Sequence, residues 1–220
     1  GSMLLANNYL RTWIVEQQID YSFKLENSRF QFTAGLTFQE DDRGGETIEG
    51  TGYTSDALIN NILAAPVKNI LSTVHSNYRY NAAYGRIHYD YKGKYLLNIT
   101  ARRDGSNRFG PGNRFGNFGA VGVGWIFSRE SFMKNSASFI NFGKVRASYG
   151  ITGNDVIGDF QYLTTYTAAN PYAGQSSLTL TRLGNPDYSW ESNRKLEAAV
   201  ELSFFKDRIQ FSSAVYRNRS

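Results

Sequence analysis

The sequence predicts an all-β fold, an antiparallel up-and-down meander of about eight strands. First, apolar and polar residues alternate with a period of two over long stretches, which is the pattern of a strand with two different faces. Second, the composition of 15 Phe, 15 Tyr, 21 Gly and only 4 Pro combines residues that favour strands with residues that favour turns. Third, short connections alternate with long ones, so consecutive strands should run up and down.

The first two strands flank a hairpin turn at Glu26-Asn27-Ser28, whose residue types favour tight turns. Before the turn, polar residues face one side and these apolar residues face the other: Trp13, Val15, Ile19, Tyr21, Phe23 and Leu25. After it, Phe30 to Gln39 forms the clearest strand of the chain, with one face made by Phe30, Phe32, Ala34, Leu36 and Phe38.

The next two strands form a second hairpin around Lys92-Gly93-Lys94. One strand carries Ile87, Tyr89 and Tyr91 on its apolar face. The other carries Tyr95, Leu97, Ile99 and Ala101. Each has charged or amide residues at the intervening positions, so each is expected to present one apolar and one polar face.

Four further strands complete the meander. The fifth runs through about Phe118 to Phe127, and the sixth presents Val145, Ala147 and Tyr149 opposite Lys144, Arg146 and Ser148. Their connection, residues 128–141, is longer and is expected to carry a short helical turn. The seventh has Leu196, Ala198, Val200, Leu202 and Phe204 on one face, and a turn at Lys206-Asp207 leads to the eighth with Ile209 and Phe211.

The connections indicate a membrane barrel. Short connections near 26–28, 92–94, 128–141 and 206–207 alternate with long ones over 40–78, 103–116 and 151–192. Outer-membrane barrels have short periplasmic turns, long external loops and strands of about 9–11 residues. The meander is therefore predicted to be part of a large transmembrane β-barrel. Within the first long connection, Ser55 to Ala65 is expected to form a short amphipathic helix that covers loop residues.

The apolar faces carry no Asp, Glu, Lys or Arg, and one such charge facing lipid at the midplane would cost about 2–4 kcal/mol. The mean hydropathy of −0.44 does not argue against this, because alternating strands average their two faces. No run approaches the roughly 20 apolar residues of a membrane-spanning helix. The alternative is a soluble β-barrel or sandwich acting as a ligand-binding module, which would have to pack all these aromatic residues inside.

Several kinds of chemistry are excluded or disfavoured by composition. With no cysteine, the chain has no disulfide framework, thiol nucleophile or thiolate metal site. The net charge of +5 is spread over 24 basic and 19 acidic residues without a basic block, so no nucleic-acid partner is expected. We expect no catalytic residue, no metal site and no cofactor, since His75 and His88 have no convincing partner and the acidic groups Asp41-Asp42 and Asn154-Asp155 with Asp159 lack calcium-loop spacing.

The polar faces should line the lumen of the complete barrel with mixed charge, from Glu16, Asp20, Arg86, Asp90, Lys144, Arg146, Glu197 and Glu201. The substrate-binding residues are unknown from sequence. Tyr188 and Trp190 could stack on sugars, although Trp190 is better interpreted as an anchor for its loop. The segment Arg102 to Arg114 could contact a ligand or lipopolysaccharide, but its glycines and proline favour the interpretation as a tight loop.

Four ordered motifs resemble one family. They are Tyr84-Gly-Arg-Ile-His-Tyr-Asp-Tyr-Lys-Gly-Lys-Tyr-Leu-Leu97, Arg102-Arg-Asp-Gly-Ser-Asn-Arg-Phe-Gly-Pro-Gly-Asn-Arg114, Val145-Arg-Ala-Ser-Tyr-Gly-Ile-Thr-Gly-Asn-Asp155 and Asn185-Pro-Asp-Tyr-Ser-Trp-Glu191. In this order they resemble the barrel of the SusC/RagA family of TonB-linked (TonB-dependent) outer-membrane transporters. The resemblance is strongest over residues 78–216.

The resemblance implies an active transporter in the Gram-negative cell outer membrane that imports glycan fragments or peptides. Its energy would come through TonB, and its partners would be a SusD-like surface lipoprotein, an oligosaccharide or peptide substrate, and outer-membrane lipid. Gly1-Ser2-Met3 is interpreted as an expression scar. Residues 4–220 are expected to be an internal fragment of the receptor barrel, without plug domain or C-terminal strand, that either closes into a smaller barrel or pairs its edges with a second copy.

Overall fold

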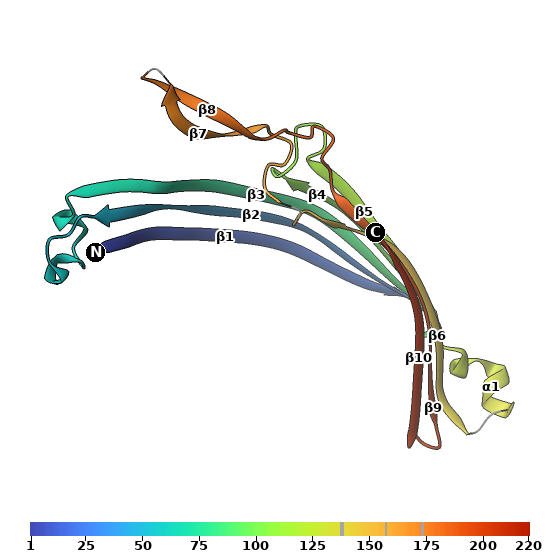
Figure 1. The fold of residues 1–220 in the computed structure, drawn as a ribbon. Helices are drawn as coiled ribbons and strands as arrows, with labels where there is room; N and C mark the ends of the chain where they lie inside the picture. Colours follow the sequence, from blue (N-terminus) through green and yellow to red (C-terminus); the bar gives the residue numbers. More distant parts are fainter. Residues whose placement is uncertain (137–138, 157, 173) are drawn as a thin grey trace. The chain divides into compact units, whose positions relative to one another are not determined.

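The computed structural model describes residues 1–136, 139–156, 158–172 and 174–220, and most of these residues lie in strands (Figure 1). The strands are β1 (Ser2–Leu25), β2 (Ser28–Thr51), β3 (Val67–Tyr91), β4 (Tyr95–Ser106), β5 (Phe115–Trp125), β6 (Ile140–Asn154), β7 (Thr165–Tyr172), β8 (Gln175–Arg182), β9 (Glu191–Phe204) and β10 (Ile209–Arg219). The short helices are η1 (Asp56–Leu58), η2 (Ile62–Ala64), η3 (Phe127–Arg129) and α1 (Ser131–Ser136).

Eight strands form one sheet in the order β1-β2-β3-β4-β5-β6-β9-β10, which confirms the predicted meander. The pairings resolved from β4 to β10 are antiparallel. β7 and β8 pair only with each other and form a separate hairpin inside the connection from β6 to β9 (Figure 1). In the described part of the chain, β1 and β10 stand at opposite ends of the strand order, so the predicted closure into a smaller barrel is wrong.

The chain divides into two compact units, residues 1–15 with 38–80 and residues 16–37 with 81–220. In the first unit, the predicted long loop over 40–78 is wrong, because β2 and β3 are 24 and 25 residues long and leave only 52–66 between them. Glu40 Oε1 accepts hydrogen bonds from Asn77 Nδ2 at 2.7 Å and Arg79 Nε at 3.1 Å. Polar contacts of this kind stabilise the strand pair, and they do not require a regular alternation of apolar residues in the sequence.

The amphipathic helix predicted over Ser55 to Ala65 is also wrong, since two separate 3-10 turns occupy the segment. The Ser55 side chain accepts from Ala57 N at 3.3 Å, and Asn61 Oδ1 accepts from Leu63 N at 3.0 Å. Each capping side chain starts a new turn, so one continuous helix does not form. The helical turn predicted within 128–141 is confirmed by η3 and α1, although residues 137–138 lie outside the described residues.

The apolar faces of β4, β5, β6 and β9 lie in register and form one continuous apolar belt. Val123, for example, lies between Leu97 and Ala147, and Ala147 lies opposite Ala198. No layer of the described structure covers this belt, as Val123 is 53% and Trp125 is 40% exposed. A soluble barrel or sandwich would bury these side chains, so that alternative is wrong for the fold seen here. Among the described residues, no helix combines the length and apolar character needed to cross a membrane.

On the opposite, polar face, Tyr84 of β3 lies over Gly35 of β2 and donates to Gln18 Oε1 of β1 at 2.9 Å. A Cβ at Gly35 would stand 2.4 Å from the Tyr84 ring and 2.8 Å from the Gln17 carbonyl oxygen. We therefore expect Gly35→Ala to destabilise the fold by about 1–3 kcal/mol through overpacking.

Urea unfolding of the two variants Gly35→Ala and Gly122→Ala measures this effect. The matched control has room, because a Cβ at Gly122 would meet its nearest atom at 3.6 Å. Equal stability of the two variants would contradict the close packing of Tyr84 on Gly35.

Candidate functional site

A network of four charged side chains lies on the polar face of β6 and β9. The register places Lys144 opposite Glu201 and Ser148 opposite Glu197, so Arg146 stands between the two carboxylates. Arg146 Nε donates to Glu201 Oε1 at 3.1 Å, and its Nη1 donates to Glu197 Oε1. Lys144 Nζ lies 3.6 Å from Glu201 Oε2. Two positive and two negative charges balance, and their side chains remain between 24% and 38% exposed, so the network is neutral and in contact with water.

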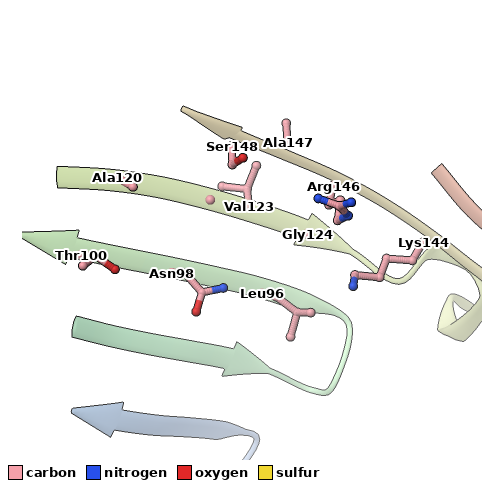
Figure 2. Close-up of a pocket in the computed structure, with 11 residues that line it drawn as sticks. Leu96, Asn98, Thr100, Ala120, Val123, Gly124, Lys144, Arg146, Ala147 and Ser148 are labelled. Carbon is pink, nitrogen blue, oxygen red and sulfur yellow. The ribbon is translucent and has the colours of Figure 1, made fainter. Parts of the chain in front are cut away.

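Beside this network, the polar face forms a shallow depression of about 280 Å³. Its floor is β5, because Ala120, Gly122 and Gly124 carry little or no side chain on this face. Figure 2 shows Asn98 and Thr100 on β4 along one side and Lys144 extending from β6 toward Leu96. The depression therefore offers amide, hydroxyl and ammonium groups over an exposed backbone, which suits hydrated polar ligands or another polar protein surface.

The other residues predicted to line the lumen have mixed roles in the structure. Asp20 accepts from Thr33 Oγ1 at 2.6 Å and Gln18 Nε2 at 2.7 Å, and Arg86 Nη2 donates to Asn98 at 3.3 Å. Glu16 is exposed on β1. Asp90 instead caps a turn, since its Oδ1 accepts from Gly93 N at 2.7 Å. It thus has a local structural role that its place on the polar face did not indicate.

Two of the recognised motifs meet in an aromatic loop cluster formed by Phe109, Phe118, Tyr188 and Trp190. Phe109 is fully buried, with its ring centroid 5.0 Å from Trp190 and 6.0 Å from Tyr188. Trp190 also meets Phe118 edge-on at 5.4 Å and donates from Nε1 to the Arg114 carbonyl at 3.2 Å. Trp190 therefore anchors its loop as predicted, and Tyr188 packs on Phe109. Sequence periodicity gave no signal for Phe109, which lies in a loop.

Of the two acidic groups considered for calcium, the one with Asp155 and Asp159 binds an arginine instead. Arg108 Nε donates to Asp159 Oδ1 at 2.7 Å, its Nη1 donates to the Asp155 carbonyl at 3.1 Å, and Nη1 lies 3.7 Å from Asp155 Oδ2. The Arg108 side chain is 12% exposed. Across 1–136, 139–156, 158–172 and 174–220, no group of three His, Cys, Asp or Glu residues could hold a metal ion. The segment around Arg108 thus holds two loops together, as its tight-loop interpretation predicted.

At the turn end of the sheet, Glu130 ties the η3 segment to the β3–β4 hairpin. Its carboxylate accepts from Lys94 Nζ at 2.8 Å, Tyr95 OH at 2.8 Å and Trp125 Nε1 at 3.3 Å. The hydrogen bonds from Lys94 and then Tyr95 hold the pKa of Glu130 below its ordinary value. The charged carboxylate is therefore the form that stabilises this contact.

Because the pKa of Glu130 is lowered on folding, its contribution is complete above the ordinary pKa of about 4.3 and is lost as the pH falls through the folded-state pKa. We expect Glu130→Gln to lower the Tm at about pH 7 and to lower it by less near pH 3. Thermal unfolding of both proteins at the two pH values measures it. A Tm difference that is the same at both would show that the carboxylate charge does not matter.

Each of the two histidines lies near polar side chains of neighbouring strands. His88 Nδ1 lies 2.8 Å from Asn98 Oδ1 on the polar face. His75 Nδ1 lies 3.7 Å from Asp42 Oδ1 and 3.5 Å from Tyr9 OH, and its side chain is 71% exposed.

Comparisons with known proteins agree on one family. The family described as "TonB dependent receptor-like, beta-barrel" matches residues 3–220. TonB-dependent receptor P39 of Formosa agariphila is 43% identical over 66% of this chain and 14% of its own length. TonB-dependent receptor P26 of the same organism is 34% identical over 90% of this chain and 20% of its own length. TonB-dependent receptor SusC of Bacteroides thetaiotaomicron is 30% identical over 87% of this chain and 19% of its own length.

The fold is also similar to solved structures. A structure of the RagAB peptide transporter matches with a TM-score of 0.83 and 22% identity, over 98% of this chain and 24% of that chain. A second, of the RagAB peptide importer in a closed state, gives a TM-score of 0.82 and 20% identity over 99% of this chain and 24% of that chain. The chain thus spans at most about a quarter of these proteins.

Proposed function

Since this chain belongs to the TonB-dependent receptor β-barrel family and SusC is among its relatives, we propose that it is a wall segment of an outer-membrane active transporter. The transporter imports glycan fragments or peptides with energy passed through TonB. Residues 4–220 contribute barrel strands and external loops, and the rest of the receptor supplies the plug. The segment has no catalytic role of its own.

The observation that carries this proposal is the pair of contrasting faces on one sheet. The apolar belt, which includes Leu97, Val123 and Ala147, is exposed and uncharged, as a lipid-facing surface must be. The opposite face carries the neutral Lys144/Arg146/Glu197/Glu201 network and the depression over β5, as a wet lumen requires. A soluble binding module would need the reverse arrangement.

The proposed partners follow from the same arrangement. Oligosaccharide or peptide would pass along the polar face, and the neutral ion-pair network suits a cargo without a fixed charge. A SusD-like surface lipoprotein would cap the external side, where the loop cluster around Phe109 gives the loops a rigid base. The similarity to SusC and to RagAB supports the lipoprotein, and the similarity to the RagAB peptide transporter supports a peptide cargo.

The test measures uptake of cargo by cells that carry the full-length receptor together with its SusD-like surface lipoprotein. Labelled oligosaccharides and peptides are offered to wild-type cells, cells without the receptor and cells without TonB. We expect accumulation of one cargo class only when receptor and TonB are both present. Accumulation that continues without TonB, or a receptor that is absent from the outer-membrane fraction, would overturn the proposal.

A further inference from the structure

The apolar belt contains a groove of about 460 Å³ close to the β3–β4 turn, which is here named the turn-end groove. It is lined by Tyr89, Tyr95, Leu96, Leu97, Val123, Gly124, Trp125, Val145, Arg146 and Ala147. The small side chain of Ala147 leaves room on the β6 side of the groove, and Tyr95 and Trp125 line it toward the turn. Its volume lies within the range of about 300–1,000 Å³ that ligand sites occupy.

Two cations stand at the turn beside this groove. Lys92 Nζ lies 5.2 Å from the ring centroid of Tyr91, and Tyr91 stacks on Tyr95 at 6.3 Å, so the ammonium is held at the end of the apolar belt. Arg129 Nη1 donates to the Gly93 carbonyl at 2.7 Å, which places the guanidinium at the same turn. Among the described residues, Lys94 forms the ion pair with Glu130. No carboxylate partner is recorded there for Lys92 or Arg129.

The charge of the whole turn end has the same sign. Each short turn, over residues 24–29, 90–94, 127–136 and 205–208, carries one more basic than acidic residue. Neighbouring turns are in contact, since Lys92 N donates to the Asn27 carbonyl at 2.7 Å. This edge of the sheet is therefore a positive rim beside an apolar groove. Each basic group near a membrane surface contributes about 1 kcal/mol to the binding free energy with anionic lipid.

We propose that the turn-end groove is a binding site for one anionic phospholipid of the periplasmic leaflet. One acyl chain lies in the groove between Tyr95, Trp125 and Ala147, and the phosphate is bound near Lys92 and Arg129. Short turns of such barrels face the periplasm, which fixes the leaflet. The aromatic rings lie at headgroup depth, where tyrosine and tryptophan are favoured. This inference rests on the proposed outer-membrane location.

The experiment uses the full-length receptor extracted in mild detergent from isolated outer membranes, so a failure of membrane insertion is seen before lipid binding is measured. Phosphatidylglycerol is titrated in, with phosphatidylcholine as the uncharged comparison, and bound lipids are counted by native mass spectrometry. The variant Ala147→Leu fills the groove. Its control is Ala198→Leu, the same change in the same row one strand away and outside the groove.

A second variant, Lys92→Gln, tests the headgroup contact. Its control is Lys206→Gln, because both lysines lie in short turns with positive φ of 55° and 60°. We expect Ala147→Leu to lose one bound phosphatidylglycerol and Lys92→Gln to bind it about fivefold more weakly. The two controls should match wild type.

Any of three results would overturn the site. The first is that Ala147→Leu binds phosphatidylglycerol as tightly as Ala198→Leu does. The second is that Lys92→Gln binds phosphatidylglycerol as tightly as Lys206→Gln does. The third is that the wild-type receptor binds phosphatidylcholine and phosphatidylglycerol equally tightly. A receptor that reaches the outer membrane and gives any of these keeps its proposed function but lacks this lipid site.

Discussion

Phe109→Ala is expected to destabilise the loop cluster by about 3–5 kcal/mol, the usual cost of truncating a buried aromatic side chain. Phe109 is the largest fully buried side chain of the described structure, and its loss would leave a cavity beside Tyr188 and Trp190. The loops before β5 and before β9 should then open. Limited proteolysis of the folded receptor, with cleavage sites mapped over residues 107–114 and 183–190, measures this opening.

The matched control is Leu183→Ala in the connection between β8 and β9. Leu183 is 74% exposed, so its truncation leaves no cavity and should not change the cleavage rate. If both variants were cleaved like wild type, the burial of Phe109 would contribute little to loop order, and the loop cluster would not be the rigid base of the external side.

Val121→Arg is expected to lower the free energy of unfolding in lipid vesicles by about 2–4 kcal/mol. Val121 lies in the middle of β5 between Ile99 and Tyr149, at a position of the apolar belt that should face the bilayer interior. An arginine there would have to leave water for hydrocarbon. Urea titration of the receptor folded into vesicles gives the free energy.

The control is Ala120→Arg, the adjacent residue on the polar face of the same strand. There the guanidinium would point into the water-filled lumen, where a substitution at a water-exposed position usually changes stability by about 0.5 kcal/mol or less. Equal losses for the two variants would mean that the two faces do not differ in environment, against the membrane interpretation of the sheet.

Sequence periodicity predicted the strands that have one apolar face. Phe30 to Gln39 and Lys195–Phe204 both fall within observed strands, and the short turns lie where glycine, asparagine and charged residues cluster. The prediction failed where apolar residues do not alternate regularly with polar ones. Residues 40–51 and 67–78 extend β2 and β3, because backbone pairing and contacts such as that of Glu40 with Arg79 do not need apolar alternation. The β7–β8 hairpin was also missed, although Leu178 and Leu180 alternate with Thr179 and Thr181 in β8.

The candidate site was predictable in part. Alternation placed Lys144, Arg146, Glu197 and Glu201 on polar faces, but their contacts depend on the register of β6 against β9, two strands separated by a long connection. Such register is set by pairing in space and cannot be read from local sequence. The contact between Lys94 and Glu130 is similarly distant along the chain. Trp190 could be interpreted as an anchor because its motif is polar apart from its aromatic residues.

Alternate residues of β5 should face lipid and water in the complete barrel, and single-cysteine labelling measures this alternation residue by residue. The chain has no cysteine of its own, so each introduced thiol reports one position of this segment. Cysteines at Ala120, Gly122, Val121 and Val123 are treated with a membrane-impermeant maleimide in outer membranes that contain the receptor. We expect labelling at Ala120 and Gly122 and protection at Val121 and Val123. Equal labelling at all four positions, or protection at the first pair only, would contradict it.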